Sequence, residues 1–351
     1  MKKAMSTGST LRSGTTDIGL RYLAAVDFDD AVAIDAEILG LSRRAYFERR
    51  LQAALKAPKD HVQFAATRDG KLAGYALARR MAGEFGRAEP ALRLETIGVA
   101  PGQQDRGVGM RLLGELERWA LEHDIRQVRT SAHWRSHGLL GFLDRAGFEL
   151  GGNHIIDCAV HADRLGDLET ADAAAPPGRQ GAGAETDYGA PAANDFETLA
   201  RDRADVHGLA PADLADIIAI DRDITGRSRD GYLTRLFDEA LNDSAIRVSL
   251  VARRGMAVGF IMAKTDFGDF GRTGPTAVID TIGVHPQFAG AGIGTAMLSQ
   301  LFVNLHALQV ERVETVVAAE NFDLLGFFYK AGFSPSQRLA LVKRLSQEKL
   351  R

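Results

Sequence analysis

The most informative part of the chain is ETIGVAPGQQDRGVG, at residues 95–109, where an apolar run is followed by a proline, polar residues and two glycines. The frame recurs 185 residues later as DTIGVHPQFAGAGIG, at residues 280–294. Over residues 84–109 and 269–294, 11 of 26 positions are identical, whereas composition alone would give roughly two. The chain therefore contains two copies of one folding unit.

Length fits this organisation, because 351 residues exceed the roughly 250 to 300 that one hydrophobic core usually supports. The sequence between the copies is rich in Ala, Gly and Pro and poor in aliphatic residues, which is typical of a linker. We therefore expect a flexible tail at residues 1–16, a first domain at 17–164, a linker at 165–200 and a second domain at 201–351.

Charge and composition exclude several kinds of partner. The net charge of -3 leaves no basic footprint for nucleic acid, and no run of about 18 apolar residues predicts a membrane span. The single cysteine, Cys158, cannot form an internal disulfide and lies in an apolar run that predicts a buried thiol. We expect a cytoplasmic protein without a nucleic-acid or membrane partner, and the sequence leaves a homodimer open.

Each copy has the same order of predicted elements. In the first, strands at residues 18–23, 62–67, 73–79 and 94–99 precede the glycine loop, with a helix near 29–39. An amphipathic helix follows the loop, and then come a strand, a short helix and a last strand. We predict an α/β fold in which each copy completes its own mixed sheet, flanked by helices.

A strand, a glycine turn and a helix in this order direct backbone N–H groups and the positive end of a helix dipole at one point, which favours an anion. A phosphate-binding Walker loop requires Gly-Lys-Ser/Thr, and neither copy has that lysine. A dinucleotide-binding loop requires a third glycine where Leu112 and Met297 stand. Both of these alternatives fail on a required residue.

The pattern Gln/Arg-x-x-Gly-x-Gly/Ala remains, matched by Gln104, Gly107 and Gly109 after a V-x-P strand end. Gly-Phe pairs follow at residues 141–142 and 147–148, and again at 326–327 and 332–333. Together with these pairs, the loop of each copy resembles the acetyl-CoA loop of the GNAT acetyltransferase superfamily. The resemblance implies two domains, each with a mixed, mostly antiparallel sheet whose fourth and fifth strands splay apart. The pantetheine of acetyl-CoA would lie in that gap.

The resemblance also assigns the residues that bind acetyl-CoA. Backbone groups near the strand end would hold the pantetheine, and the loop would hold the pyrophosphate. In the first copy these residues are Ile97, Gly98, Val99, Gln104, Asp105, Arg106, Gly107, Val108 and Gly109; in the second they are Ile282, Gly283, Val284, Ala289, Gly290, Ala291, Gly292, Ile293, Gly294 and Asn321. Asp105 places a negative charge beside the phosphates, so the second copy is the better-formed candidate.

Acetyl transfer to an amine requires a base, because an alkyl ammonium has a pKa near 10. The family often has a carboxylate four residues before the valine of V-x-P, where Glu95 and Asp280 stand. Both could equally be strand carboxylates that face solvent. The family's usual tyrosine acid is replaced by Leu143 and Phe328, so Tyr329, one residue later, is the candidate acid, with packing as the alternative.

The acceptor pocket is the part that the sequence describes least. Both copies contain a G-x-S-R segment, at residues 40–43 and 226–229, and an FGR segment, at residues 85–87 and 270–272. The candidates for substrate binding in or just after these segments are Arg43, Tyr46, Arg87, Arg229, Tyr232 and Arg272. Capping and packing are the alternative roles for the residues of the G-x-S-R segments. His133 and His137 have no third ligand nearby, so we expect no metal site.

These residues predict an acetyl-CoA-dependent N-acetyltransferase that acetylates a small-molecule amine by direct attack in a ternary complex. Two other functions remain open at this stage. One is acetylation of a protein or peptide, and the other is a non-catalytic CoA-binding scaffold or sensor, which the missing tyrosine suggests.

Overall fold

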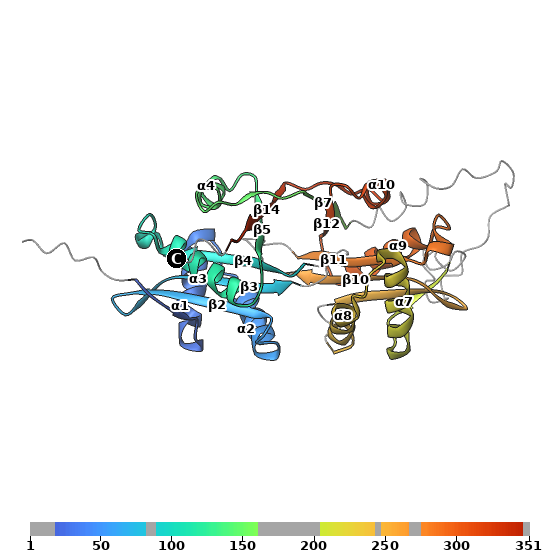
Figure 1. The fold of residues 1–351 in the computed structure, drawn as a ribbon, viewed down its shortest axis with the longest axis horizontal. Helices are drawn as coiled ribbons and strands as arrows, with labels where there is room; N and C mark the ends of the chain where they lie inside the picture. The colour runs from blue at the N-terminus through green and yellow to red at the C-terminus, as the bar shows by residue number, and fades with distance from the viewer. Residues whose placement is uncertain (1–17, 82–88, 161–203, 243–246, 267–274, 347–351) are drawn as a thin grey trace, which may run out of the picture.

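The computed structural model describes residues 18–81, 89–160, 204–242, 247–266 and 275–346. The predicted tail, the linker, Arg87 and Arg272 lie outside these residues, as do the predicted domain boundaries, which stay predictions. Figure 1 shows two sheets end to end, one for each copy of the repeat. We call residues 18–160 the first unit and residues 204–346 the second unit.

The two units have the same elements in the same order. The first contains β1 (Gly19–Tyr22), α1 (Phe28–Leu39), α2 (Arg44–Lys56), β2 (His61–Arg68), β3 (Lys71–Met81), β4 (Ala91–Val99), α3 (Val108–Glu122), β5 (Gln127–His133), α4 (His137–Arg145), β6 (Glu149–Leu150) and β7 (Asn153–Ala159). The second contains β8 (Asp205–Gly208), α7 (Leu214–Thr225), α8 (Asp230–Asn242), β9 (Arg247–Arg254), β10 (Met256–Asp266), β11 (Thr276–Val284), α9 (Ile293–Ala307), β12 (Arg312–Ala318), α10 (Phe322–Lys330), β13 (Ser334–Pro335) and β14 (Arg338–Arg344). The predicted repeat is confirmed.

Each sheet has seven strands. Their orders are β1-β2-β3-β4-β5-β14-β6 in the first sheet and β13-β7-β12-β11-β10-β9-β8 in the second. Among the described strands, β4 pairs with β5 and β11 with β12 in parallel, and the other neighbours are antiparallel. The predicted fold class, α/β with mixed, mostly antiparallel sheets, is confirmed.

The last strand of each unit lies in the sheet of the other unit. Strand β14 pairs with β5 along its whole length, and β7 pairs with β12 in the same way (Figure 1). The expectation that each copy completes its own sheet is therefore wrong. Lys343 of β14 forms an ion pair with Glu117 of α3 in the first unit, so a side-chain partner as well as the ladder holds β14 in that sheet. Gly151, between β6 and β7, donates its N–H to Ala340 O at 2.8 Å where the chain crosses from one sheet to the other.

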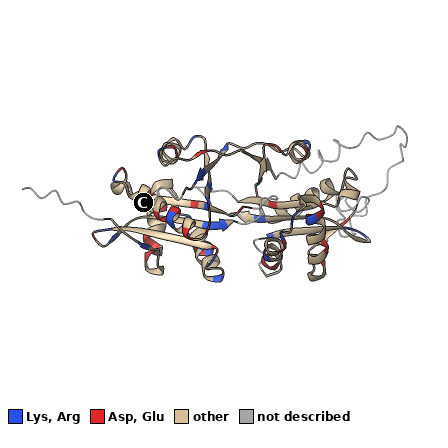
Figure 2. Ribbon diagram, in the orientation of Figure 1, with Lys and Arg blue, Asp and Glu red and all other residues tan. Residues whose placement is uncertain are grey.

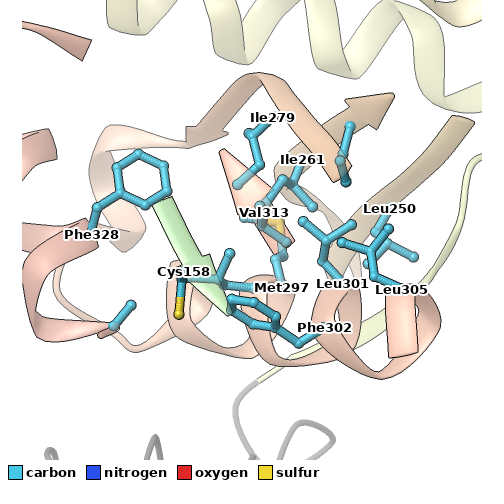
Figure 3. Packing of buried hydrophobic residues seen from close by; sticks show 14 of the residues in the cluster. Cys158, Leu250, Ile261, Ile279, Met297, Leu301, Phe302, Leu305, Val313 and Phe328 are labelled. Carbon is cyan, nitrogen blue, oxygen red and sulfur yellow. The ribbon is translucent and has the colours of Figure 1, made fainter. Parts of the chain in front are cut away.

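The hydrophobic cores follow the exchanged strands. Ile156 and Cys158 of β7 are buried in the core of the second sheet, and Leu341 of β14 is buried in the core of the first. Figure 3 shows Cys158 beside residues of α9 such as Met297 and Phe302. The prediction of a buried thiol is confirmed. Each core therefore requires side chains from both units.

The two units also meet through polar contacts. Trp134 N donates to Gln337 O at 3.0 Å where the exchanged strands begin, and Arg235 lies 3.7 Å from Asp60 between the helical faces. Figure 1 shows α1, α2, α7 and α8 below the central strands, with α4 and α10 above them. Among the described helices, none is both long and apolar enough to cross a bilayer.

Candidate active site

The fourth and fifth strands of each unit separate along their length, as the family resemblance implied. Strand β4 pairs with β5 only at Leu92 and Arg93, and β11 pairs with β12 only over residues 276–278. At each fork a threonine of the fifth strand bonds to the fourth: Thr130 Oγ1 donates to Leu94 O at 3.1 Å, and Thr315 Oγ1 to Ile279 O at 3.2 Å. Beyond this point, each sheet is open between its two strands.

Both candidate bases lie on β-bulges. The register between β3 and β4 shifts at Leu77 and Ala78 and passes over Glu95, and the register between β10 and β11 shifts in the same way and passes over Asp280. A bulge bends its strand and redirects a side chain. The two carboxylates thus occupy equivalent special positions, which alternating apolarity alone did not reveal.

The glycine loops have one backbone conformation in both units. Gly107 and Gly292 cap α3 and α9 with φ of 79° and 75°, and two residues earlier Asp105 and Gly290 have φ of 57° and 76°. Positive φ suits glycine, and Asp is among the few other residues that tolerate it. The first N–H groups of a helix have no partner within it, so each loop forms an anion cradle.

The second unit has a large cavity at this cradle, with a volume of about 1180 Å³. It is lined by predicted cofactor residues from the strand, the loop and α10: Ile282, Gly283, Val284, Ala289, Gly290, Gly292, Ile293, Gly294 and Asn321. Of the second-copy prediction, only Ala291 is outside the lining. Asn321 caps α10 by accepting a hydrogen bond from Leu324 N at 3.2 Å. The structure thus brings nearly all of these residues to one elongated space.

The first cradle differs in its side chains. Gln104 Nε2 donates to Val99 O at 3.3 Å, so the backbone carbonyl at the end of β4 already accepts a hydrogen bond from this side chain. Ala289, the equivalent residue in the second unit, has no polar side chain. Asp105 and Arg106 are exposed on the loop. The first cradle therefore carries a polar amide and an acidic group at positions where the second has Ala289 and Gly290.

Glu95 is buried between two guanidinium groups. It forms an ion pair with Arg50, and Arg79 Nε lies 3.5 Å from its other oxygen. Burial alone would raise the pKa of Glu95, but the charges of Arg50 and Arg79 outweigh burial and lower the pKa to about 2. A carboxylate with so low a pKa, in a cluster of net positive charge, is a poor base for an ammonium ion.

Asp280 forms an ion pair with one arginine, Arg247, which also pairs with a second carboxylate. Its Oδ2 is 2.6 Å from Arg247 Nη1, and Arg247 Nε is 2.8 Å from Glu239 Oε2. One guanidinium is thus shared by two carboxylates, and the charges of Lys264 and Arg79 also reach Glu239. Asp280 also lines a cavity between the two units. Asp280 therefore reaches a cavity, whereas Glu95 is enclosed by its two arginines.

Comparison with known proteins identifies the fold. The profile of the acetyltransferase (GNAT) family matches residues 32–148 and again residues 214–333, which is more than half of the chain. This chain belongs to the GNAT family. Both matches contain a glycine loop and its forked strands, so the resemblance seen in the sequence is confirmed.

Solved structures similar to this GNAT chain include two-domain proteins. A tandem GNAT protein of the clavulanic acid biosynthesis pathway, solved without acetyl-CoA, aligns with a TM-score of 0.58 at 16% identity over 93% of this chain and 98% of its own. A GCN5-related N-acetyltransferase from Sphaerobacter thermophilus aligns with a TM-score of 0.56 at 16% identity, covering 93% and 95%. A glucosamine N-acetyltransferase region of a fungal multi-domain β-N-acetylglucosaminidase aligns with a TM-score of 0.59 at 15% identity over 93% of this chain. The match covers only 38% of that protein's own chain.

Tyr329 is not brought to the GNAT cavity. Tyr329 is 43% exposed. Phe327 and Lys330 of the same helix line the cavity, whereas Tyr329 is not among the described residues that line it. Phe328, at the family's tyrosine position, is fully buried in the core. One residue along a helix turns a side chain by about 100°, which accounts for the difference. The geometry does not support Tyr329 as the acid.

The arginines predicted to bind substrate are paired inside the protein. Arg43 Nε is 2.8 Å from Asp35 Oδ2, and the guanidinium lies 4.9 Å from the centre of the Tyr46 ring. In the second unit Arg229, Asp221 and Tyr232 repeat this arrangement. Arg43, Tyr46 and Tyr232 are buried, and of these four residues Arg229 alone lines the cavity at the α9 cradle. The expected anion-binding role is therefore unsupported for Arg43, because an aspartate of the preceding helix already neutralises it.

We expect His61, beside the Glu95 cluster, to make stability depend on pH. Burial and the charge of Arg50 lower the pKa of His61 from 6.5 to about 4. Below pH 6.5 His61 binds a proton in the unfolded chain, whereas in the folded protein it stays neutral down to about pH 4. The free energy of unfolding therefore decreases as the pH falls from 6.5 toward 4, by up to about 1.4 kcal/mol per pH unit. Urea unfolding between pH 7.5 and 5.0 measures this slope. His61→Gln should flatten it, and equal slopes in both proteins would contradict the assignment.

Proposed function

We propose that the second unit is an acetyl-CoA-dependent N-acetyltransferase that acetylates a small-molecule amine by direct attack in a ternary complex. The observation that carries this proposal is the cavity of about 1180 Å³ at its glycine loop, which runs from the α9 cradle to the open strand end. Pockets of several hundred Å³ or more bind ligands of cofactor size.

The residues present fit acetyl-CoA, which would supply an activated acetyl thioester. Unpaired N–H groups at the start of α9 suit the pyrophosphate, and no acidic residue stands in this loop. The backbone at Ile282, Gly283 and Val284, where β11 has left β12, suits the amide groups of pantetheine. Asn321 and the exposed ring of Phe322 line the same cavity at the start of α10.

Asp280 supplies the base in this proposal. It shares the single guanidinium of Arg247 with Glu239 and lines a cavity, so its carboxylate is placed to accept the proton of an ammonium ion there. Glu95, the equivalent carboxylate of the first unit, lies instead between the guanidinium groups of Arg50 and Arg79. The first unit then has a structural role at its own fork, and catalysis belongs to the second.

Calorimetry with acetyl-CoA tests the assignment of the cofactor site. We expect one binding site per chain, together with thiol release when amines are added. Two equivalent sites would contradict the restriction to the second unit. An absence of acetyl-CoA binding would overturn the enzyme function, and binding with turnover of peptides alone would overturn the small-molecule acceptor.

Asp280→Asn should lower kcat by about 100-fold or more, because general-base catalysis typically contributes 10²–10⁴-fold. The affinity for acetyl-CoA should stay close to that of the natural protein, since Asp280 does not line the cofactor cavity. Steady-state thiol release and calorimetry separate these effects. Asp280→Glu, which keeps the charge, is the matched control and should recover part of the rate; equal kcat in Asp280→Asn would remove Asp280 from the mechanism.

A further inference from the structure

A second cavity, of about 510 Å³, lies where the two units meet. Its walls come from β4, β5 and β14 of the first sheet and from β7, β11 and β12 of the second. Gly151 and Gly152, where the chain crosses from one sheet to the other, also line it, as do the end of β3 and Arg227. Figure 1 shows the exchanged strands bridging this region from above. The cavity thus exists only because the two units are joined.

This inter-unit cavity borders the cofactor cavity of the second unit. Arg227 lines both of them. On β11 the change occurs between neighbouring residues, because Asp280 lines the inter-unit cavity and Thr281 lines the cofactor cavity. A molecule in the inter-unit cavity would therefore lie on the Asp280 side of the open fork, with the cofactor on the other side.

The inter-unit cavity carries charges of both signs. Its basic residues are Arg79, Arg93, Arg129, Arg227 and Arg344, and its acidic residues are Glu89, Asp280, Glu314 and Glu320. Figure 2 shows Lys and Arg along β5 and β14 and on the strands where the units meet. A lining with both signs complements a molecule that itself carries both an ammonium and an anionic group.

Two of these arginines are available for a ligand. Within the described part of the chain, neither Arg227 nor Arg344 forms an ion pair. Arg227 lies next to the cofactor cavity, and Arg344 stands at the end of β14 in the first sheet. A guanidinium group binds a carboxylate through two parallel hydrogen bonds, which gives both affinity and orientation.

We propose that this inter-unit cavity binds the acceptor, and that the acceptor is an amino-carboxylate of amino-acid to dipeptide size. This inference rests on the proposed acetyltransferase function of the second unit. Arg344 and Arg227 bind the carboxylate, and the amine lies toward Asp280. The exchange of β14 then has a functional consequence, because it carries Arg344 from the sequence of the second unit into the wall formed by the first.

The transfer step balances in atoms and charge. The acceptor nitrogen forms an amide bond to the acetyl carbon while the carbon–sulfur bond breaks. Of the two protons that the ammonium group loses, one passes to Asp280 and on to solvent, and the other ends on the released thiol. The arginines take no part in proton transfer, so they position the acceptor and determine specificity.

The test uses the full-length protein, acetyl-CoA, the twenty common L-amino acids and the carboxamide of each. Thiol release gives kcat and KM, and calorimetry in the presence of coenzyme A gives amino-acid binding. We expect at least one amino acid to have a KM about 10- to 100-fold below that of its carboxamide, the usual effect of a charge-assisted hydrogen bond. Equal KM values for acids and carboxamides, or no amino-acid binding, would overturn the proposal.

Arg344→Gln gives the sharper measurement, because Arg344 lines only the inter-unit cavity. It should raise KM for the preferred amino acid about tenfold or more and leave both the carboxamide KM and acetyl-CoA binding unchanged. Arg145→Gln, on the exposed end of α4, is the matched control and should change neither. An unchanged amino-acid KM in Arg344→Gln would refute the role of Arg344.

The outcomes also separate this inference from the proposed function. If acetyl-CoA binds and neutral amines are acetylated better than amino acids, the second unit is an acetyltransferase and the amino-carboxylate site is wrong. If acetyl-CoA does not bind, the proposed function fails first, and the inference fails with it.

Discussion

Cutting the chain within residues 161–203 is expected to leave both fragments bound together in one particle. Strand β7 stays in the second sheet and β14 stays in the first, and each forms a ladder of seven residue pairs there. Their buried side chains, such as Ile156 and Leu341, each contribute about 1.5–3 kcal/mol by leaving water. A protease site inserted in this segment, followed by size-exclusion chromatography with light scattering, measures the association.

The uncut protein with the same insertion is the control for this experiment. Each fragment expressed alone should aggregate, because the edge of β5 or β12 and the adjacent core lose their cover, and co-expression should restore solubility. Two fragments that separate as folded monomers without denaturant would show that each unit can complete its own sheet. That result would contradict the exchange.

Gly290→Asp is expected to weaken acetyl-CoA binding by about 10- to 100-fold, since it places a negative charge beside the phosphates at a few ångströms, where unit charges interact by about 1 to 4 kcal/mol. The equivalent residue of the first unit is Asp105, which already has the same left-handed conformation, so the backbone can accept the change. Calorimetry with acetyl-CoA measures the effect, which should shrink as the salt concentration rises.

Gly290→Asn is the matched control, because asparagine has the same shape, tolerates positive φ and carries no charge. It should bind acetyl-CoA more tightly than Gly290→Asp does. Equal affinities of the two variants would mean that side-chain volume, rather than charge, excludes the cofactor. Normal affinity in both would place the cofactor outside the α9 cradle and contradict the proposed site.

The family and the conformation of each glycine loop could be predicted from the sequence because they depend on residues close together in the chain. In each unit the strand end, the glycine at position 107 or 292 and the start of the helix lie close together in the chain, from Val99 to Val108 and from Val284 to Ile293. Their order alone directs N–H groups at one point. The repeat strengthened this prediction, since both copies preserve the frame.

The state of the candidate bases could not be predicted in this way. Glu95 meets Arg50, which is 45 residues away, and Asp280 meets Arg247, which is 33 residues away. Nothing near either carboxylate in the sequence reveals whether one or two guanidinium groups will surround it. The number of arginine partners, two for Glu95 and one for Asp280 among the ion pairs of the described residues, therefore appears only after the helices and strands have packed.

The sequence by itself determined that this protein has two GNAT units with two glycine cradles, because local order and apolar spacing specify them. Only the tertiary structure decided that the units exchange β7 and β14, and hence that a charged cavity lies between them. The physical reason is that an exchanged strand finds its ladder partners and its ion pairs, such as Lys343 with Glu117, in segments far away along the chain. Its choice depends on the path of the chain at Gly151 and on packing between segments far apart in the sequence.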